Sequence, residues 1–357
     1  MSADNIARLR AALLERKAAA AIITSLPNVR YICGFTGSNA ILLVTAEHLT
    51  LFTDPRYTLQ AKVETQSVQA TVTIVRGALE PAVGEALIGF RAVAFENARI
   101  RYGTLQAIQK GLAKRTKLIS LDDTCETLRM VKSDGEIELI RESGVLNSQA
   151  FADALFHFER GMTETELAAE IEYRMRRGGA EKAAFDTIVA FQSNSALPHA
   201  HPGSAKIDGT GLLLIDMGTL RGGYASDMTR MVHLGRPSTR ARELYRAVLE
   251  AQLAAVDRIR PGVTTGSVDA AARRVLRAHG LDKAFVHSTG HGLGLEIHEL
   301  PRIGKTDKTR LEPGMTITVE PGAYLEGFGG VRIEDTVLVT ARGCEVLTPT
   351  SKDLTVF

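Results

Sequence analysis

The 357-residue chain is short of cysteine, of net charge and of long apolar runs, and each shortage excludes a class of protein. Its three cysteines, Cys33, Cys125 and Cys344, stand far apart without paired spacing, which excludes a disulfide scaffold and fits a reducing compartment. The formal net charge is +2 and no long basic run occurs, so neither a nucleic acid nor a membrane surface is expected as a partner. No run approaches the roughly 20 apolar residues that span a bilayer, and the first residues lack a signal-peptide core. These absences favour a soluble, cytoplasmic protein.

What is present is ordinary globular sequence, with 45% hydrophobic and 24% charged residues. The chain is too long for one ordinary core, so a small and a larger domain are expected. Short predicted strands and helices alternate over about the first 120 residues, which indicates an α/β domain. The polar stretch 128–136 predicts a linker, and the long helices and strand-like runs beyond it indicate an α+β domain with a largely antiparallel sheet. We therefore expect domains at 1–128 and 129–357.

Four acidic residues of the second domain lie in, or next to, predicted strands. They are Asp216, Asp227, Glu320 and Glu334, and the strand-like runs are 212–217, 229–234, 315–320 and 331–339. Glycines between the first two acids suit a tight hairpin, which would bring both carboxylates to the same end of the sheet. Alternation in the last run predicts that Arg332 and Glu334 share one face.

Taken singly, each acid has an ordinary explanation, such as a turn cap for Asp216 or a surface position for Glu334. Taken together they indicate a metal site, because acids converging on a buried core repel one another unless cations supply the opposite charge. Seven of the nine histidines fall between positions 199 and 298. One of them, His291, stands between glycines, where backbone segments can approach closely. Several carboxylates with a single imidazole suit Mn²⁺ or Co²⁺, and Zn²⁺ is possible.

Five segments in order along the chain resemble the Xaa-Pro peptidases, prolidase and aminopeptidase P, which are M24 metallopeptidases with a pita-bread catalytic domain. The segments are Asp216-Met-Gly, Ser226-Asp227-Met-Thr-Arg230, His287-Ser-Thr-Gly-His291-Gly-Leu-Gly, Val319-Glu320-Pro-Gly and Gly330-Val-Arg332-Ile-Glu334-Asp335. The first domain resembles the creatinase-like N-terminal domain of that family through Pro27-Asn-Val-Arg-Tyr31 and Thr53-Asp-Pro-Arg-Tyr57. Methionine aminopeptidases share the catalytic fold but usually lack such a domain, which argues against them.

The resemblance implies a set of ligands for two divalent metal ions, most naturally Mn²⁺. By matching positions, these ligands would be Asp216, Asp227, His291, Glu320 and Glu334. Asp216 would bind one metal through both oxygens, and Asp227 and Glu334 would bridge the two ions. A metal pair of this kind lowers the pKa of a water molecule from 15.7 towards about 7.

The resemblance also implies roles around the metals. Glu320 would shuttle a proton, and His298 would donate to the developing oxyanion. His287 and His199 would line the substrate pocket, and Arg332 would hold a ligand carboxylate in place. Two further residues stay open between a substrate role and an ordinary one: Tyr224 binds substrate or packs in a strand, and Arg302 binds a substrate carboxylate or lies at the surface.

The activity implied is hydrolysis of the peptide bond that precedes proline, by an enzyme that forms a homodimer. Whether the substrate is a dipeptide or a longer peptide stays open in the sequence. Two other functions are considered: a non-catalytic pita-bread binding module and a metal-free, creatinase-like C–N hydrolase. Relatives of these kinds do not keep the full ligand set, and this chain carries all five ligands, which favours the metallopeptidase.

Overall fold

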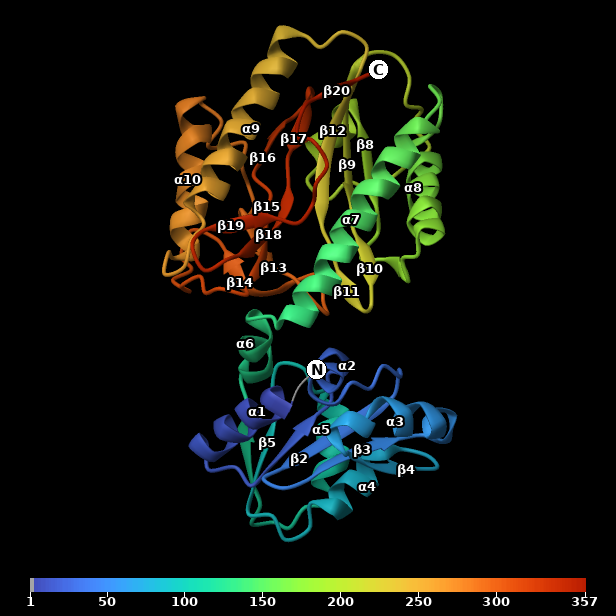
Figure 1. The fold of residues 1–357 in the computed structure, drawn as a ribbon, viewed down its shortest axis with the longest axis vertical. Coiled ribbons are helices and arrows are strands. Elements are labelled where there is room, and N and C mark those ends of the chain that lie inside the picture. Colours follow the sequence, from blue (N-terminus) through green and yellow to red (C-terminus); the bar gives the residue numbers. More distant parts are fainter. Residues whose placement is uncertain (1–2) are drawn as a thin grey trace. The chain divides into compact units, whose positions relative to one another are not determined.

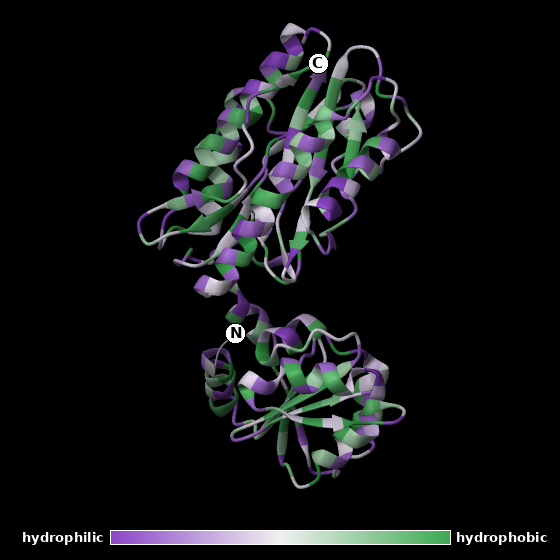
Figure 2. Cartoon of the chain, turned by 45° about the vertical axis from the view of Figure 1, so that its right-hand side comes forward, coloured by the Kyte–Doolittle hydropathy of each residue, from purple (hydrophilic) through white to green (hydrophobic). Residues whose placement is uncertain are grey.

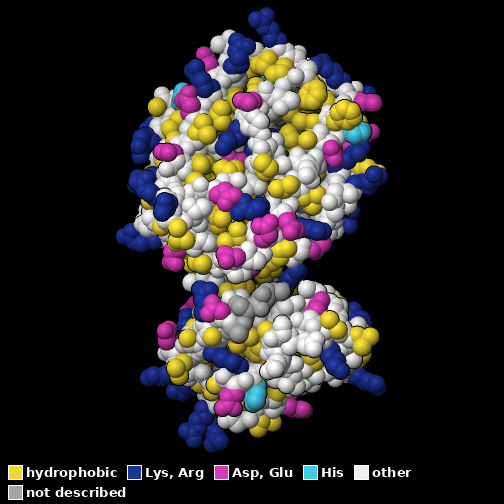
Figure 3. All heavy atoms as spheres, in the orientation of Figure 1, with side chains coloured by type: hydrophobic (Ala, Val, Ile, Leu, Met, Phe, Trp, Pro, Cys, Tyr) yellow, Lys and Arg dark blue, Asp and Glu magenta, His cyan; other side chains and the backbone are white. Residues whose placement is uncertain are grey.

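The computed structural model describes residues 3–357, which divide into two compact units between Arg129 and Met130 (Figure 1). The sequence predicted a division after residue 128. The strands of both units are strongly apolar, whereas the helices carry apolar and polar faces (Figure 2). The surface visible in Figure 3 mixes basic and acidic side chains on each unit. None of the described helices is long and apolar enough to cross a membrane.

The first unit is an α/β domain built on a six-stranded mixed sheet of order β4-β3-β2-β1-β5-β6. Its strands are β1 Ala20–Ile23, β2 Ala40–Thr45, β3 Leu49–Thr53, β4 Thr71–Ile74, β5 Ala92–Phe95 and β6 Lys117–Ser120. Its helices are α1 Ala3–Glu15, α2 Leu26–Cys33, α3 Thr58–Glu64, α4 Leu79–Ala86, α5 Tyr102–Gln109 and α6 Thr124–Met130. β2 and β3 form an apolar hairpin, because they pair antiparallel and both strands are largely buried.

The predicted linker at 128–136 is wrong in its first part. Residues up to Met130 belong to α6, and the buried Arg129 of this helix donates a hydrogen bond from Nη1 to Asn28 Oδ1 at 2.7 Å. The polar appearance of this segment therefore reflects an internal contact of the first unit. Beyond it, α7 Asp134–Phe156 and α8 Glu164–Gly178 are the first of the long helices predicted after the linker, and Thr163 forms a capping box with Glu166.

The second unit places its sheets between two pairs of helices (Figure 1). The four-stranded sheet, of order β20-β12-β9-β8, and the five-stranded sheet, of order β14-β13-β15-β18-β19, hold most strands of this unit. Helices α7 and α8 share one core with the first sheet, and α9 Thr239–Arg258 and α10 Thr265–Ala278 pack on the other side. The larger sheets contain β8 Ile188–Phe191, β9 Gly211–Met217, β12 Met228–Leu234, β13 Gly290–Gly292, β14 Glu299–Ile303, β15 Thr316–Val319, β18 Asp335–Val339, β19 Cys344–Val346 and β20 Thr355–Val356. Small sheets add β7 Lys182–Ala183, β10 Thr219–Arg221, β11 Tyr224–Ala225, β16 Gly322–Leu325 and β17 Gly329–Arg332.

The single strand predicted at 331–339 is wrong. The chain forms β17 in a two-stranded sheet with β16, and then β18 in the five-stranded sheet. Between them the backbone N–H of Glu334 donates to the carbonyl of Thr229 in β12 at 3.2 Å. A regular alternation of apolar and polar residues does not reveal this break, because it depends on partners far away in the sequence. Glu334 therefore lies where the chain passes from one sheet to another.

Candidate metal centre

Three side chains from distant segments meet inside the second unit. Asp227 precedes β12, His291 lies in β13 and Glu334 joins β17 to β18, and one ligand atom from each lies within 4.8 Å of the others. The sequence predicted all three as ligands. A carboxylate, an imidazole and a second carboxylate at this separation form a group that can hold a divalent cation.

Backbone packing around His291 depends on its two glycine neighbours. A Cβ atom on Gly290 would lie 2.0 Å from the carbonyl oxygen of Thr318, and one on Gly292 would lie 2.1 Å from that of Leu300. The imidazole Nδ1 pairs with the Gly292 carbonyl at 3.0 Å, which places the ring proton on Nδ1. The lone pair of Nε2 is then free to act as a ligand.

Two further acids extend the group on either side. Glu320 follows β15, and its Oε1 lies 3.5 Å from His291 Nε2, close to the 3.6 Å between that nitrogen and Asp227 Oδ2. Asp216 lies in β9, where Leu213, Ile215 and Met217 face the core of α7 and α8. Alternation therefore turns Asp216 to the opposite, inner face, towards the other acids.

The acids of this group are held together at an electrostatic cost. Burial, and to a smaller extent repulsion from neighbouring carboxylates, raises the pKa of Asp227 and of Glu334 well above the ordinary range. Burial also raises the pKa of Glu320 to about 7. The buried Oδ1 atoms of Asp216 and Asp227 have no hydrogen-bond partner among the described residues. Unpaired buried carboxylate oxygens are costly, and cations placed among them would supply the missing partners. The residues present therefore fit divalent metal ions.

Arg332 organises one side of the group. Its Nη2 donates to Asp216 Oδ2 at 2.6 Å, and its Nε donates to the hydroxyl of Thr229 at 3.0 Å. That hydroxyl in turn donates to Glu334 Oε2 at 2.7 Å. One guanidinium thus orients Asp216 directly and Glu334 through Thr229. Arg332 donates to Oδ2 of Asp216, and Oδ1 of that carboxylate has no hydrogen-bond partner among the described residues. Each carboxylate oxygen carries two lone pairs, so binding of a metal through both oxygens stays a prediction.

Tyr324 connects Arg332 with His287 and was not identified from the sequence. Its hydroxyl accepts from Arg332 Nη1 at 2.8 Å and lies 2.9 Å from His287 Nε2. His287 Nδ1 donates to the carbonyl of Ser288 at 2.7 Å, so Nε2 accepts the tyrosine proton. Burial and the nearby Arg332 lower the pKa of His287 to about 4, which keeps its imidazole neutral.

The other two predicted histidines lie beside this network. The ring of His298 packs edge-on against that of His291, with centroids 4.4 Å apart, and burial lowers its pKa. The residue after it, Glu299, forms a buried ion pair with Lys132 at 3.1 Å, which anchors the turn that carries His298. His199 is exposed in the loop after residues 192–196, and it is among the groups that lower the pKa of His287 and of His298.

The two residues left open by the sequence differ in their surroundings. Tyr224 is 2% exposed, and its hydroxyl donates to Glu136 Oε1 in α7 at 2.9 Å, which favours strand packing over a substrate role. Arg302 is exposed and lies directly opposite His291 in the register of β13 and β14. Directly opposite residues of an antiparallel pair share one face of the sheet, so Arg302 stays a candidate for substrate binding.

Comparisons with known proteins agree with this architecture. The sequence model of "Metallopeptidase family M24" matches residues 138–341, and that of the "Creatinase/Prolidase N-terminal domain" matches residues 5–131. The chain is 37% identical to an Xaa-Pro dipeptidase of Pyrococcus horikoshii over 94% of each protein. It is similar to the structure of an Xaa-Pro dipeptidase from Bacillus anthracis, with a TM-score of 0.95, 36% identity and 99% of each chain covered. It is also similar to that of an X-Pro aminopeptidase from Thermotoga maritima, with a TM-score of 0.89, 37% identity, and 96% of this chain and 99% of that chain covered.

Proposed function

Because the chain belongs to metallopeptidase family M24, we propose that it hydrolyses the peptide bond that precedes proline in short Xaa-Pro peptides. The observation that carries this proposal is the buried meeting of Asp227, His291 and Glu334, with ligand atoms within 4.8 Å of one another. Asp216 and Glu320 complete the proposed ligand set for two cations. Four carboxylates and one imidazole favour Mn²⁺, with Co²⁺ and Zn²⁺ as alternatives. When bound, such cations supply an activated water and polarise the scissile carbonyl.

The side chains around the metals would handle protons and the developing charge. Glu320 is 17% exposed against 7% for Asp227, so it is the ligand better placed to take a proton from the attacking water. It would deliver that proton to the proline nitrogen, which leaves as a secondary amine. His298, which is exposed and whose lowered pKa favours the neutral imidazole, would donate to the oxyanion. Both ring nitrogens of His287 are engaged by Tyr324 and Ser288, so this histidine would shape the pocket wall beside the exposed His199.

Selectivity for proline follows from the chemistry of its amide. The Xaa-Pro amide is tertiary, has no N–H and has a fixed φ, so a site for it need not provide an acceptor at that position. We further propose that dipeptides are preferred over longer peptides. Arg302, exposed on the face it shares with His291, would bind the free carboxylate of the proline residue.

The deciding experiment measures release of alanine from Ala-Pro and from Ala-Pro-Ala-Ala, with added Mn²⁺ and with chelator. We expect metal-dependent cleavage that favours Ala-Pro. Asp227→Asn should abolish it, because this carboxylate is one of the three proposed ligands that meet, whereas the matched control Asp208→Asn changes an exposed acid and should not. A well-folded protein that binds no metal would favour the binding-module alternative. A rate unaffected by chelator would favour metal-free C–N hydrolysis.

Two broader features are part of the proposal. A homodimer is proposed from the family, and the first unit offers an apolar surface for it, since Leu59 and Val63, one turn apart on α3, are 80% and 71% exposed. Light scattering coupled to gel filtration tests this, and a monomer at micromolar concentration contradicts it. A reducing, cytoplasmic location is proposed because Cys33, Cys125 and Cys344 are all free thiols.

A further inference from the structure

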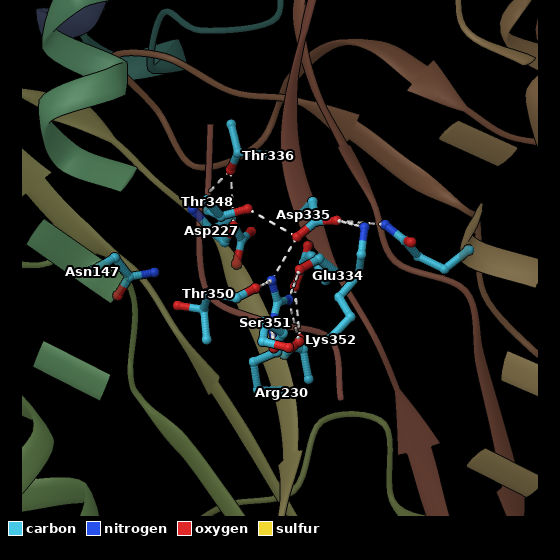
Figure 4. A network of polar contacts seen from close by, with 12 residues as sticks. Asn147, Asp227, Arg230, Glu334, Asp335, Thr336, Thr348, Thr350, Ser351 and Lys352 are labelled. Atoms are coloured by element: carbon cyan, nitrogen blue, oxygen red, sulfur yellow. Dashed lines mark hydrogen bonds and ion pairs between the residues drawn. The ribbon is translucent and has the colours of Figure 1, made fainter. Parts of the chain in front are cut away.

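A buried polar network surrounds the backbone at Glu334 and is not accounted for by metal binding (Figure 4). We call it the Asp335 clamp; it consists of Arg230, Asp335 and Lys352. Arg230 is 3% exposed and Asp335 is fully buried, and they pair through Nη2 and Oδ1 at 2.7 Å. Lys352 Nζ pairs with Asp335 Oδ2 at 2.7 Å. Buried charges of this kind persist only where their partners are complete.

Arg230 holds the main chain of Glu334. Its Nη1 donates to the carbonyl of Glu334 at 2.5 Å and to that of Thr229 at 3.0 Å. The N–H of Glu334 donates to the carbonyl of Thr229, so both backbone polar groups of Glu334 are fixed to β12. Because side chains alternate along a strand, Thr229 and Arg230 point to opposite faces of β12. Thr229 therefore holds the Glu334 carboxylate on one face, and Arg230 holds its backbone from the other.

The clamp also explains why Asp335, next to a proposed ligand, would not itself bind a cation. Its Oδ1 accepts from Arg230 and from the Thr348 hydroxyl, and its Oδ2 accepts from Lys352 and from Gln252 Nε2 at 2.8 Å. All the strong acceptor directions of the carboxylate are therefore directed at protein donors. A neighbouring carboxylate that is already saturated cannot compete with Glu334 for the metals.

The chain end completes the clamp. Arg230 donates to the carbonyl of Thr350 at 2.7 Å and to that of Ser351 at 3.0 Å, so the segment 348–352 closes over the ion pair. The residue after Asp335 fixes the main chain of Asp227, another proposed ligand, because the Thr336 hydroxyl accepts from the N–H of Asp227 at 3.2 Å and donates to its carbonyl at 2.9 Å. Asp335, acting through Arg230, thus fixes the main chain at Glu334. The next residue, Thr336, fixes the main chain at Asp227.

We propose that Arg230, Asp335 and Lys352 are positioning residues that set the metal affinity of the centre by fixing the Glu334 carboxylate. The C-terminal segment 348–352 is then a working part of the metal centre, although none of its side chains is a proposed ligand. This inference rests on the proposed role of Glu334 as a metal ligand. Outer partners of metal ligands typically change metal affinity or activity by about 10-fold to 100-fold when they are lost.

The test uses the full chain after a chelator has removed its metal. Titration calorimetry then measures the affinity for Mn²⁺. Lys352→Met should weaken Mn²⁺ binding by about 10-fold or more, and Lys352→Arg should restore most of it. At saturating Mn²⁺ the KM for Ala-Pro should stay near the wild-type value, because no clamp residue is proposed to contact the peptide. The milder Thr348→Val removes one of the four donors to the Asp335 carboxylate and leaves both cationic side chains in place, so it should weaken binding by about 3-fold to 10-fold.

The matched control is Arg141→Met, which breaks the ion pair between α7 and Glu345 of β19 without a contact to Glu334. It should leave Mn²⁺ affinity within about twofold of wild type. Folded Lys352→Met and Thr348→Val proteins that bind Mn²⁺ as wild type does would overturn the inference and leave the proposed function intact. Wild-type protein that binds none of Mn²⁺, Co²⁺ and Zn²⁺ would overturn both.

Discussion

The metal-free protein should become less stable as pH rises, and Glu320→Gln should remove a defined part of that loss. An acid whose pKa is higher in the folded than in the unfolded state stabilises the fold below its unfolded pKa, and this stabilisation is lost as pH rises through the folded value. For Glu320 the unfolded pKa is 4.5 and the folded pKa is about 7. Their difference, at 1.36 kcal/mol per pKa unit, gives an upper figure of about 3 kcal/mol.

The measurement is the difference in unfolding free energy between Glu320→Gln and wild type, in chelator, from pH 4.5 to pH 8. Buried histidines such as His287 act in the opposite direction, because their pKa is lowered, and taking the difference between the two proteins cancels them. We expect a difference near zero at the acidic end that grows through pH 7 to about 1–3 kcal/mol in favour of the variant. In a thermal melt this corresponds to about 2–4 °C per kcal/mol for a unit of this size.

Two comparisons make the result decisive. Glu326→Gln changes an exposed glutamate of the same unit and should show no such pH dependence. Added Mn²⁺ should reverse the order of stability, because the wild-type acids then gain a partner that the variant binds less well. A difference between Glu320→Gln and wild type that stays flat with pH would refute the electrostatic account of the centre.

Three further substitutions test individual contacts. Thr229→Val keeps the shape but removes the donor to Glu334, so calorimetry should show Mn²⁺ affinity reduced by about 10-fold to 100-fold, whereas Thr229→Ser should stay near wild type. Tyr324→Phe removes the link between Arg332 and His287, so kcat for Ala-Pro should fall by about 10-fold or more with the fold unchanged by circular dichroism; an unchanged kcat contradicts this link. Arg302→Met should raise the KM for Ala-Pro by about 10-fold or more and change that for Ala-Pro amide little, and equal effects on both would exclude carboxylate binding.

The parts of the site that the sequence could predict are those written into short segments. Asp216 lies near the end of an apolar strand, and the glycines beside His291 indicate a close backbone approach that the structure confirms. Thr229 could have been found by the same reasoning, since it lies two positions after Asp227 and alternation puts the two on one face. Predictions from such local patterns hold in the folded protein because each pattern reflects the requirements of a single strand or turn.

The parts that the sequence could not predict depend on which distant segments pair. The break between β17 and β18 arises because Glu334 bonds to Thr229, 105 positions earlier. Tyr324 gains its role from Arg332 and His287, neither of which can be placed beside it by periodicity. Likewise the polar segment before α7 looked like a linker, because nothing local shows that Arg129 is buried against Asn28. Tertiary partners decided each case.

The proposed metal centre has two opposing requirements. The proposed ligands repel one another in the absence of metal, so neutralising one of them, as in Glu320→Gln, should stabilise the metal-free fold and weaken metal binding. The residues that fix the ligands have no such conflict, because the Asp335 clamp is electrostatically satisfied with or without cations. Loss of Lys352 should therefore lower both metal-free stability and Mn²⁺ affinity. The sign of the stability change in chelator therefore distinguishes a residue that binds the metals from one that positions a ligand. A clamp variant that stabilises the metal-free protein would identify its residue as a metal ligand and contradict the positioning role.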